Sequence, residues 1–244
     1  LSQGFPDYPI DERLMDLVSK AMHDDRNQYA PMPGVSALRE RIAEKYQSFY
    51  NISVHPEQEI TVTTGATQAI FTTIAAIVRP GDEVIIFEPA YDCYRPTIEL
   101  FGGTVVPATL HAPEFAVDWN EVSQLVRDKT RLIIVNNPGN PACTVWTKDD
   151  LLQLEKIVTN NDLFVLSDEV YEHLIYDNYQ HQTALLFEHL RARSFVIASF
   201  GKLLHCTGWK LGYVIAPEYL TNEFRKVHQQ NIFSANTPMQ HAVA

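Results

Sequence analysis

The sequence is poor in cysteine and in positive charge. Its three cysteines, Cys93, Cys143 and Cys206, lie far apart and form no C-x-x-C pair, which is typical of a reducing compartment rather than of a disulfide framework. We therefore expect a cytoplasmic protein. The chain has 19 lysines and arginines against 30 aspartates and glutamates, a net charge of −11. This balance argues against a nucleic-acid surface, because phosphate backbones recruit clustered cations.

Long apolar runs and a signal-peptide pattern are also absent. The longest mostly apolar run, 69–78, is broken by two threonines and is too short to span a bilayer. With 244 residues, of which 45% are hydrophobic and 20% charged, the chain can bury one full core. It starts at Leu1 and ends at Ala244 within apparently helical sequence, and we expect it to be a fragment of a longer protein.

Short β-rich runs alternate with helical periodicity along the chain. This alternation predicts an α/β fold with three α-β-α layers and a mostly parallel sheet. The continuous apolar run 132–135 is typical of a strand buried on both faces. The expected strands are 60–62, 83–87, 104–107, 131–136, 163–167, 195–199 and 212–215. The expected helices are 11–23, 35–50, 67–78, 94–101, 120–126, 148–159 and 217–231.

Ligands of such sheets collect outside the carboxyl ends of the strands. Asn140, Asp168 and Lys202 each fall just after an expected strand, so the fold predicts that they share one rim. Lys202 lies between the apolar runs 195–198 and 203–204, where burial lowers the pKa of a lysine. The resulting amine is a nucleophile that forms Schiff bases with carbonyls. Taken alone, a surface lysine after a strand is the alternative.

Asn140 and Asp168 each follow an apolar run, as Lys202 does. Asn140 lies between Pro138 and Pro141, and prolines restrict the backbone so that the loop can present one amide rigidly. A purely structural turn is the competing interpretation. Asp168 follows a buried strand and needs a cationic or hydrogen-bonding partner, or it caps the next helix. Tyr171 is close enough in sequence to reach the same ligand.

The segment 63–68 turns from a strand into a helix. A glycine-containing turn at a helix N-terminus offers free N–H groups and a positive dipole end, which suits a phosphate. An ordinary strand-to-helix turn is the alternative, in which Thr67 is only a cap. The segment lacks the glycine patterns of dinucleotide and nucleoside triphosphate sites. Tyr91 follows another strand and either lies flat over a bound ring or packs in the core.

These motifs occur together in a recognisable order. N-P-x-N-P at 137–141 is followed by S-D-E-V-Y at 167–171, then by S-F-G-K and T-G-W-K within 199–210. Over essentially its whole length the chain resembles the class I (fold-type I) pyridoxal-phosphate-dependent aminotransferases. Segments 1–7, 28–34 and 168–173 resemble the methionine and kynurenine aminotransferase branch of that family.

The resemblance implies that pyridoxal 5′-phosphate is the cofactor and that Lys202, Asp168 and Tyr171 are catalytic. Lys202 would form the Schiff base (internal aldimine), and Asp168 would pair with the protonated pyridine nitrogen. Asn140 and Tyr171 would hydrogen-bond the phenolic oxygen of the ring, and Tyr91 would stack on it. The residues implied for the phosphate are Gly65, Ala66, Thr67, Ser199 and Lys210.

The resemblance also implies a homodimer in which Tyr29 reaches the phosphate of the neighbouring subunit's cofactor. Gly4, Phe5 and Asn140 would border the substrate. Residues 1–24 would form an N-terminal segment beside the active site, and 25–244 the cofactor-binding large domain. The small C-terminal domain, with the arginine that binds the substrate carboxylate, would lie beyond Ala244.

The expected activity is transfer of an amino group from a hydrophobic, sulfur-containing or aromatic L-amino acid to a 2-oxo acid. The partners are then amino acid and 2-oxo acid substrates, with no nucleic acid and no membrane. A C–S β-lyase using the same cofactor is an alternative, because its sequence signature overlaps. A cofactor-sensing domain of a transcriptional regulator is another, but it needs a basic DNA-binding module. Glu172 and His173 do not have the spacing of metal ligands, and no metal is expected.

Overall fold

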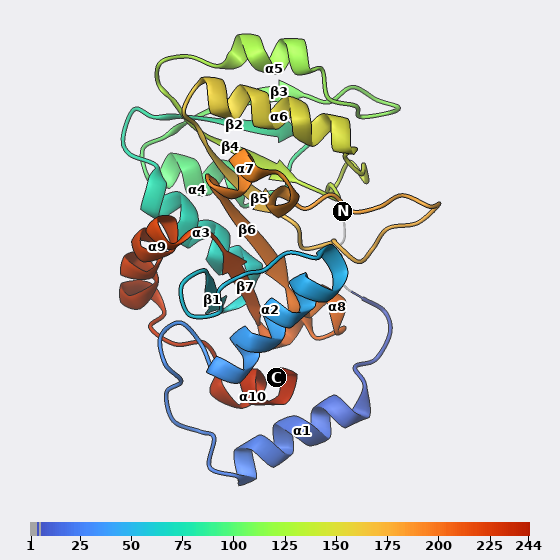
Figure 1. Cartoon of the computed structure of the whole chain (residues 1–244), viewed down its shortest axis with the longest axis vertical. Helices are drawn as coiled ribbons and strands as arrows, with labels where there is room; N and C mark the ends of the chain where they lie inside the picture. Colours follow the sequence, from blue (N-terminus) through green and yellow to red (C-terminus); the bar gives the residue numbers. More distant parts are fainter. Residues whose placement is uncertain (1–3, 5) are drawn as a thin grey trace. The chain divides into compact units, whose positions relative to one another are not determined.

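The computed structural model describes residue 4 and residues 6–244. The chain divides into two units, one with Leu1–Ala69 and Ala198–Ala244, the other with Ile70–Ile197. Helix α3 (Gly65–Ile77) and strand β6 (Ser194–Ser199) each run from one unit into the other (Figure 1).

The second unit is built on parallel strands. β6 pairs with β5, β5 with β4, β4 with β2 and β2 with β3, and each pair is parallel. Apart from β6, the strands are β2 (Glu83–Glu88), β3 (Thr104–Thr109), β4 (Thr130–Asn136) and β5 (Phe164–Asp168). The apolar run 132–135 is wholly buried in β4, as expected for a strand covered on both faces. The prediction of a mostly parallel α/β fold is confirmed.

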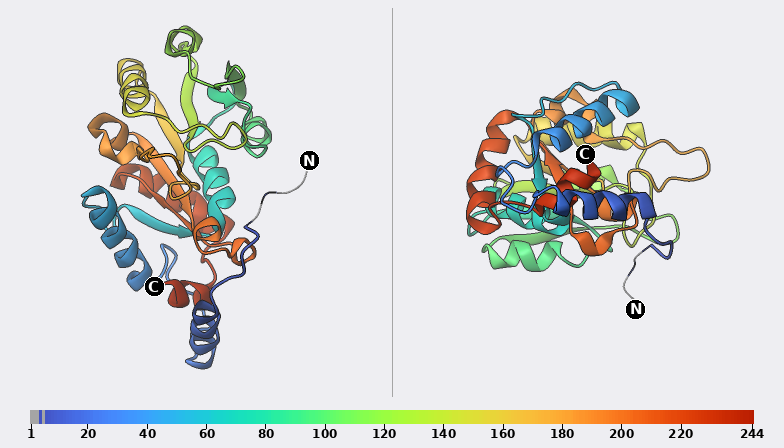
Figure 2. Two further views of the ribbon diagram at one scale, coloured as in Figure 1. Left: turned by 90° about the vertical axis from the view of Figure 1, so that its right-hand side faces the viewer. Right: turned by 90° about the horizontal axis from the view of Figure 1, so that it is seen from below.

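Helices flank these strands on both sides. The left view of Figure 2 shows α6 and α7 on one side of the parallel strands and α3 and α4 on the other. Helix α6 begins with a capping box between Thr147 and Asp150 and buries Leu151, Leu154, Ile157 and Val158. The helices of this unit besides α3 are α4 (Tyr94–Leu100), α5 (Trp119–Leu125), α6 (Lys148–Asn160), the 3₁₀ turn η1 (Ala184–Leu186) and α7 (Glu188–Arg191).

In the first unit, β1 (Ile60–Thr63) pairs antiparallel with β7 (Gly212–Ile215). The hydrogen-bonded order of the strands is β1-β7-β6-β5-β4-β2-β3. Parallel neighbours must be joined by crossover connections, and the helices between successive strands supply them. The helices are α1 (Glu12–His23), α2 (Ser36–Tyr50), α8 (Phe200–Leu203), η2 (Thr207–Trp209), α9 (Glu218–Asn231) and α10 (Thr237–Val243).

Helix α10 fastens a segment from the start of the chain. The Thr237 hydroxyl donates to the carbonyl of Gln28 at 2.7 Å and accepts from the Ala30 amide at 3.0 Å. The buried Gln240 side chain accepts from the Val35 amide at 2.8 Å. Figure 2 shows α10 beside α1, which packs against it. Residues 28–35 are thus held by side chains from the far end of the sequence.

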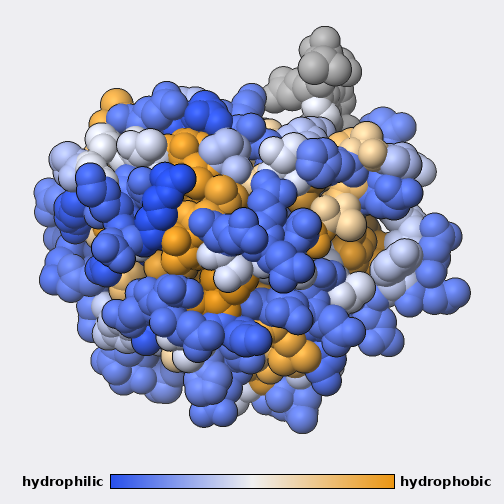
Figure 3. Space-filling model, turned by 90° about the horizontal axis from the view of Figure 1, so that it is seen from above, coloured by the Kyte–Doolittle hydropathy of each residue, from blue (hydrophilic) through white to orange (hydrophobic). Residues whose placement is uncertain are grey.

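The surface agrees with the composition. On the face shown in Figure 3, hydrophilic residues predominate and surround a narrower band of apolar ones. Among residues 4 and 6–244, no helix has the length and apolar character needed to cross a membrane.

Candidate active site

A buried acid ends β5. Asp168 is only 4% exposed, and its Oδ1 and Oδ2 accept hydrogen bonds from the Val170 amide at 3.3 Å and the Tyr94 hydroxyl at 2.6 Å. Burial raises the pKa of Asp168 to about 6, although the hydrogen bond from Tyr94 opposes that rise. A turn follows the aspartate, so the alternative that it caps a helix is wrong. The site therefore offers a buried carboxylate, and a cation beside it would stabilise its charged form.

Tyr94 is the functional residue that the sequence analysis missed. It begins α4 and is 2% exposed, and its ring meets the ring of Tyr91 edge-on at 5.7 Å between centroids. Burial and then the charge of Asp168 raise the pKa of Tyr94 well above its usual value. The phenol therefore stays protonated and donates. Its position three residues after Tyr91, at the start of the expected helix 94–101, was the available signal.

The loop that carries Asn140 is tied to the backbone of Asp168. Asn136 accepts from the Asn140 amide at 2.6 Å through Oδ1 and donates to the Asp168 carbonyl at 3.0 Å through Nδ2. The Asn137 amide donates to the same carbonyl at 3.0 Å. Both X-Pro bonds of the N-P-x-N-P loop are cis. The two preceding asparagines, to which the sequence analysis gave no role, thus fix the loop that presents Asn140.

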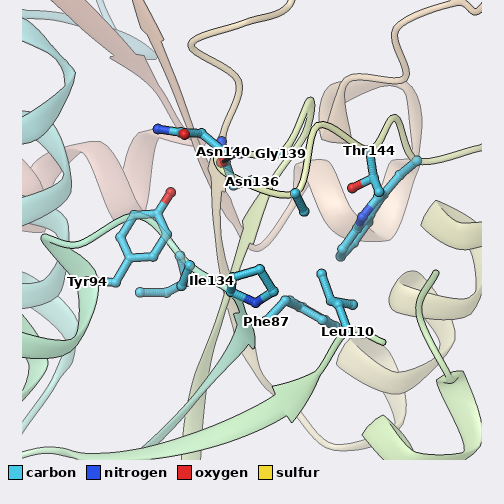
Figure 4. A pocket seen from close by; sticks show the side chains of 12 residues that line it. Phe87, Tyr94, Leu110, Ile134, Asn136, Gly139, Asn140 and Thr144 are labelled. Atoms are coloured by element: carbon cyan, nitrogen blue, oxygen red, sulfur yellow. Dashed lines mark hydrogen bonds between the residues drawn. The ribbon is translucent and has the colours of Figure 1, made fainter. Parts of the chain in front are cut away.

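A hollow lies beside this loop within the second unit. Its walls include Phe87, Leu110 and Ile134, and its polar lining residues include Asn136, Asn140 and Thr144. Figure 4 shows the hydroxyl of Tyr94 directed toward the side where Asn140 lies. Tyr171 is partly buried, and its pKa is raised by burial and by the charge of Asp168. The structure therefore brings the acid, the amide and the aromatic residues of this unit together.

Lys202 lies in α8, directly after β6. Its Nζ donates to the Gly4 carbonyl at 2.9 Å. Its pKa is lowered, first by burial and then by the charge of Lys210, which is the direction expected from the sequence. Ser199 caps α8, because its hydroxyl accepts from the Gly201 amide at 3.1 Å. The lysine is thus a weakened base fixed close to a second cation.

The second cation, Lys210, lies at the start of α3. A Cβ built on Gly65, whose φ is +77°, would lie 3.6 Å from Nζ of Lys210. Strand β7 approaches this turn closely, since a Cβ on Gly212 would lie 2.8 Å from the Ala198 carbonyl and 3.0 Å from the Ala66 amide. The helix begins at Gly65 rather than at Thr67 as predicted. Backbone N–H groups, a helix dipole and an ammonium therefore meet, and this combination suits an anion.

The remaining candidates of the first unit are more exposed. Tyr29 is 83% exposed and meets Phe233 edge-on at 5.3 Å. Thr67 and Gly4 are exposed as well. Phe5 lies outside the described residues. Burial raises the pKa of Cys206 to about 11, so this thiol is a packing residue.

Within the described part of the chain, no group of three or more His, Cys, Asp and Glu side chains is placed to hold a metal ion. The pair Glu172 and His173 therefore belongs to no such group there.

The family model described as aminotransferase class I and II matches residues 1–244. The chain belongs to this family. This aminotransferase chain is 47% identical over 244 residues to a methionine aminotransferase from Escherichia coli (strain K12), covering 100% of the chain and 63% of the relative. It is 34% identical over 255 residues to kynurenine–oxoglutarate transaminase 3 from Rattus norvegicus, covering 100% of the chain and 56% of that relative.

Solved aminotransferases share the fold. The crystal structure that identified a methionine aminotransferase function in an Escherichia coli protein matches with a TM-score of 0.97 and 47% identity, over 99% of this chain and 64% of that one. Aspartate aminotransferase from Thermus thermophilus with maleate matches with a TM-score of 0.93 and 31% identity, over 98% and 62%. The chain has the fold of type I aminotransferases and spans less than two thirds of these relatives. Aminotransferases of this family depend on pyridoxal phosphate.

Proposed function

We propose that this chain belongs to a pyridoxal-phosphate-dependent aminotransferase that transfers an amino group from a hydrophobic, sulfur-containing or aromatic L-amino acid to a 2-oxo acid. The observation that carries the proposal is the pairing of a nucleophilic amine with an anion cradle in one unit. Lys202 has a lowered pKa, and the nearby Lys210 lies against the N-terminus of α3. An aldehyde that carries a phosphate matches both features.

The residues of the two units fit the cofactor chemically. The cradle of Gly65, Ala66, Thr67, Ser199 and Lys210 supplies hydrogen-bond donors and positive charge for a phosphate. The buried carboxylate of Asp168 requires a cation, and a protonated pyridine nitrogen is one. Asn140 and Tyr171 supply an amide and a phenol for the phenolic oxygen, and Tyr91 an aromatic face.

When bound, pyridoxal phosphate supplies a ring that accepts electrons from the substrate's α-carbon. Asp168 holds a proton at the ring nitrogen, because an ionised carboxylate stabilises the cation beside it. Tyr94 holds that carboxylate in place through its 2.6 Å hydrogen bond. Lys202 would act as the base that moves a proton between the α-carbon of the substrate and the aldehyde-derived carbon of the cofactor. Its lowered pKa favours the neutral form that this role needs.

The amino donor is proposed from the relatives. The chain is 47% identical to a methionine aminotransferase. Gly4 and Phe5 would border the substrate, together with Asn140. Residues 1–24 would form the segment beside the site, and 25–244 the cofactor-binding domain.

The proposal includes a homodimer. Tyr29 is 83% exposed, yet the carbonyl before it and the amide after it are both held by the Thr237 hydroxyl. An aromatic side chain on a fixed backbone loses little entropy when it binds. This supports a role for Tyr29 in reaching the phosphate of the neighbouring subunit's cofactor.

The proposal is tested by borohydride reduction of the protein with pyridoxal phosphate, followed by peptide mass spectrometry. We expect a pyridoxyl group on Lys202 and none on Lys45 or Lys210. A Lys202→Ala variant serves as the matched control and should remain unlabelled. An unmodified Lys202 in the natural sequence would end the assignment.

A second assay separates transamination from β-elimination. The protein is incubated with methionine and a 2-oxo acid, and separately with cystathionine without an acceptor. We expect amino-group transfer in the first mixture only. Pyruvate and ammonia from the second would identify a lyase instead.

A further inference from the structure

The turn that precedes α3 is held by a side-chain amide. The Thr64 amide donates to Oε1 of Gln68 at 3.1 Å. The other end of the same side chain, Nε2, lies 3.3 Å from Nδ1 of His228 in α9. Gln68 thus links the turn to a residue 160 positions away in the sequence.

His228 is placed to be neutral. It is 0% exposed, and its ring stacks on Phe224 with centroids 5.7 Å apart and planes 20° apart. Burial lowers the pKa of His228 from 6.5 to about 4; the Met32 backbone opposes this shift and the charge of Arg225 adds to it. At neutral pH the imidazole therefore carries no charge, and one of its ring nitrogens is an acceptor.

The hydrogen bonds fix the direction of the amide. A glutamine side chain has one acceptor atom and one donor atom. Because Oε1 receives the Thr64 N–H, Nε2 must donate, and the imidazole nitrogen opposite it must accept. If His228 were replaced by a residue without an acceptor, the amide would lose its hydrogen bond to α9. The Oε1 end that receives the Thr64 amide would then be held less firmly.

We propose that His228 is a positioning residue for the anion-binding turn, acting through Gln68 to fix the direction of the N–H groups that begin α3. This inference rests on the proposed function, in which Gly65, Ala66 and Thr67 bind the phosphate of the cofactor. The relay is uncharged, so it orders the turn without adding a competing charge beside the anion. His228 itself is not assigned any contact with cofactor or substrate.

The test compares two ligands that differ only in the phosphate. Equilibrium titrations measure the affinities of the protein for pyridoxal phosphate and for pyridoxal. For His228→Leu we expect about tenfold weaker binding of pyridoxal phosphate, the usual effect of one lost hydrogen bond, and unchanged binding of pyridoxal. His228→Gln keeps an acceptor and should retain most of the affinity.

A double-mutant cycle identifies the route. Gln68→Leu removes both hydrogen bonds and should have at least the effect of His228→Leu. The double variant should be no worse than Gln68→Leu, because the histidine acts only through the glutamine. Additive losses would contradict the relay. If His228→Leu does not fold, Gln68→Leu at its partly buried position and His228→Gln still give the comparison.

The matched control is Phe224→Leu, which disturbs the packing of the same imidazole ring but removes no hydrogen bond. We expect its ratio of the two affinities to equal that of the natural protein. An equal fall in both affinities for His228→Leu would show a merely structural role and overturn the proposal. Failure of the proposed function has a different signature, since the natural protein would then acquire no pyridoxyl group on Lys202.

Discussion

Tyr94 and Asp168, 74 positions apart in sequence, are joined by a hydrogen bond of 2.6 Å between the phenol and Oδ2. Both side chains are buried. Burial alone would favour the protonated acid, and the donated hydrogen bond favours the carboxylate. The tyrosine therefore sets how low the pH can fall before the acid loses its charge.

Replacing Tyr94 by phenylalanine should raise the pKa of Asp168 further above its present value of about 6. A hydrogen bond to a charged group contributes about 1.5–3 kcal/mol, which corresponds to about one to two pKa units. We expect the acid limb of the kcat/KM profile of the complete enzyme to move to higher pH by about that amount. Tyr213→Phe is the control, because that buried hydroxyl bonds Lys45 at 2.9 Å instead. An unmoved acid limb in Tyr94→Phe would refute the prediction.

Asp168→Asn should abolish activity yet stabilise the protein without cofactor. The folded-state pKa of Asp168 is raised from 3.8 to about 6, so the folded state binds the proton more tightly than the unfolded state. The ionised carboxylate therefore costs stability that is absent below pH 3.8 and fully present above about pH 6. The shift corresponds to about 3 kcal/mol. Urea unfolding should show a gain of about 1–3 kcal/mol at pH 7 and little gain near pH 4. Equal effects at both pH values would contradict this explanation.

Lys210→Met should weaken the anion cradle. Its ammonium lies against the first residue of α3, and loss of a charged donor reduces affinity by about 10–100-fold. Titration with pyridoxal phosphate, and competition by inorganic phosphate, measure the loss. The pKa of Lys202 should also rise, because the charge of Lys210 contributes to its lowering. Lys45→Met removes a cation outside the cradle, and a similar loss there would argue against a local effect.

Thr237→Val should release the segment around Tyr29. The hydroxyl bonds both the Gln28 carbonyl and the Ala30 amide, so its removal should lower the free energy of unfolding by about 1–3 kcal/mol. Sedimentation equilibrium should show a weaker dimer, while Thr237→Ser, which keeps the hydroxyl, should resemble the natural protein. Tyr29→Ala should weaken the dimer without that loss of stability, because the side chain is exposed. A dimer unaffected by either change would exclude this interface.

Much of the fold could be predicted because its signals are local. Each expected strand and helix is present, with ends shifted by at most two residues. The continuous apolar run of β4 and the periodic apolar face of α6 are long enough to be recognised. Helices α7 and α8 have four residues each, about one turn, and carry no periodicity to detect.

The residues of the candidate site could likewise be predicted only in part. Asn140, Asp168 and Lys202 were found because each follows a strand, and topology gathers such positions. Tyr94 and His228 were missed because their partners lie 74 and 160 positions away. Packing in three dimensions decides which side chains are in contact across such distances. The spacing of residues along the chain does not predict these contacts.

The attachment of α10 to residues 28–35 has a consequence for biosynthesis. The partners of Ala30 and Val35 lie 207 and 205 positions later. At about 5–20 residues per second, a ribosome needs about 10–40 s to deliver them. For that interval the backbone around Tyr29 exists without these two hydrogen-bond partners, so it cannot take up this attachment until the chain has been made as far as α10.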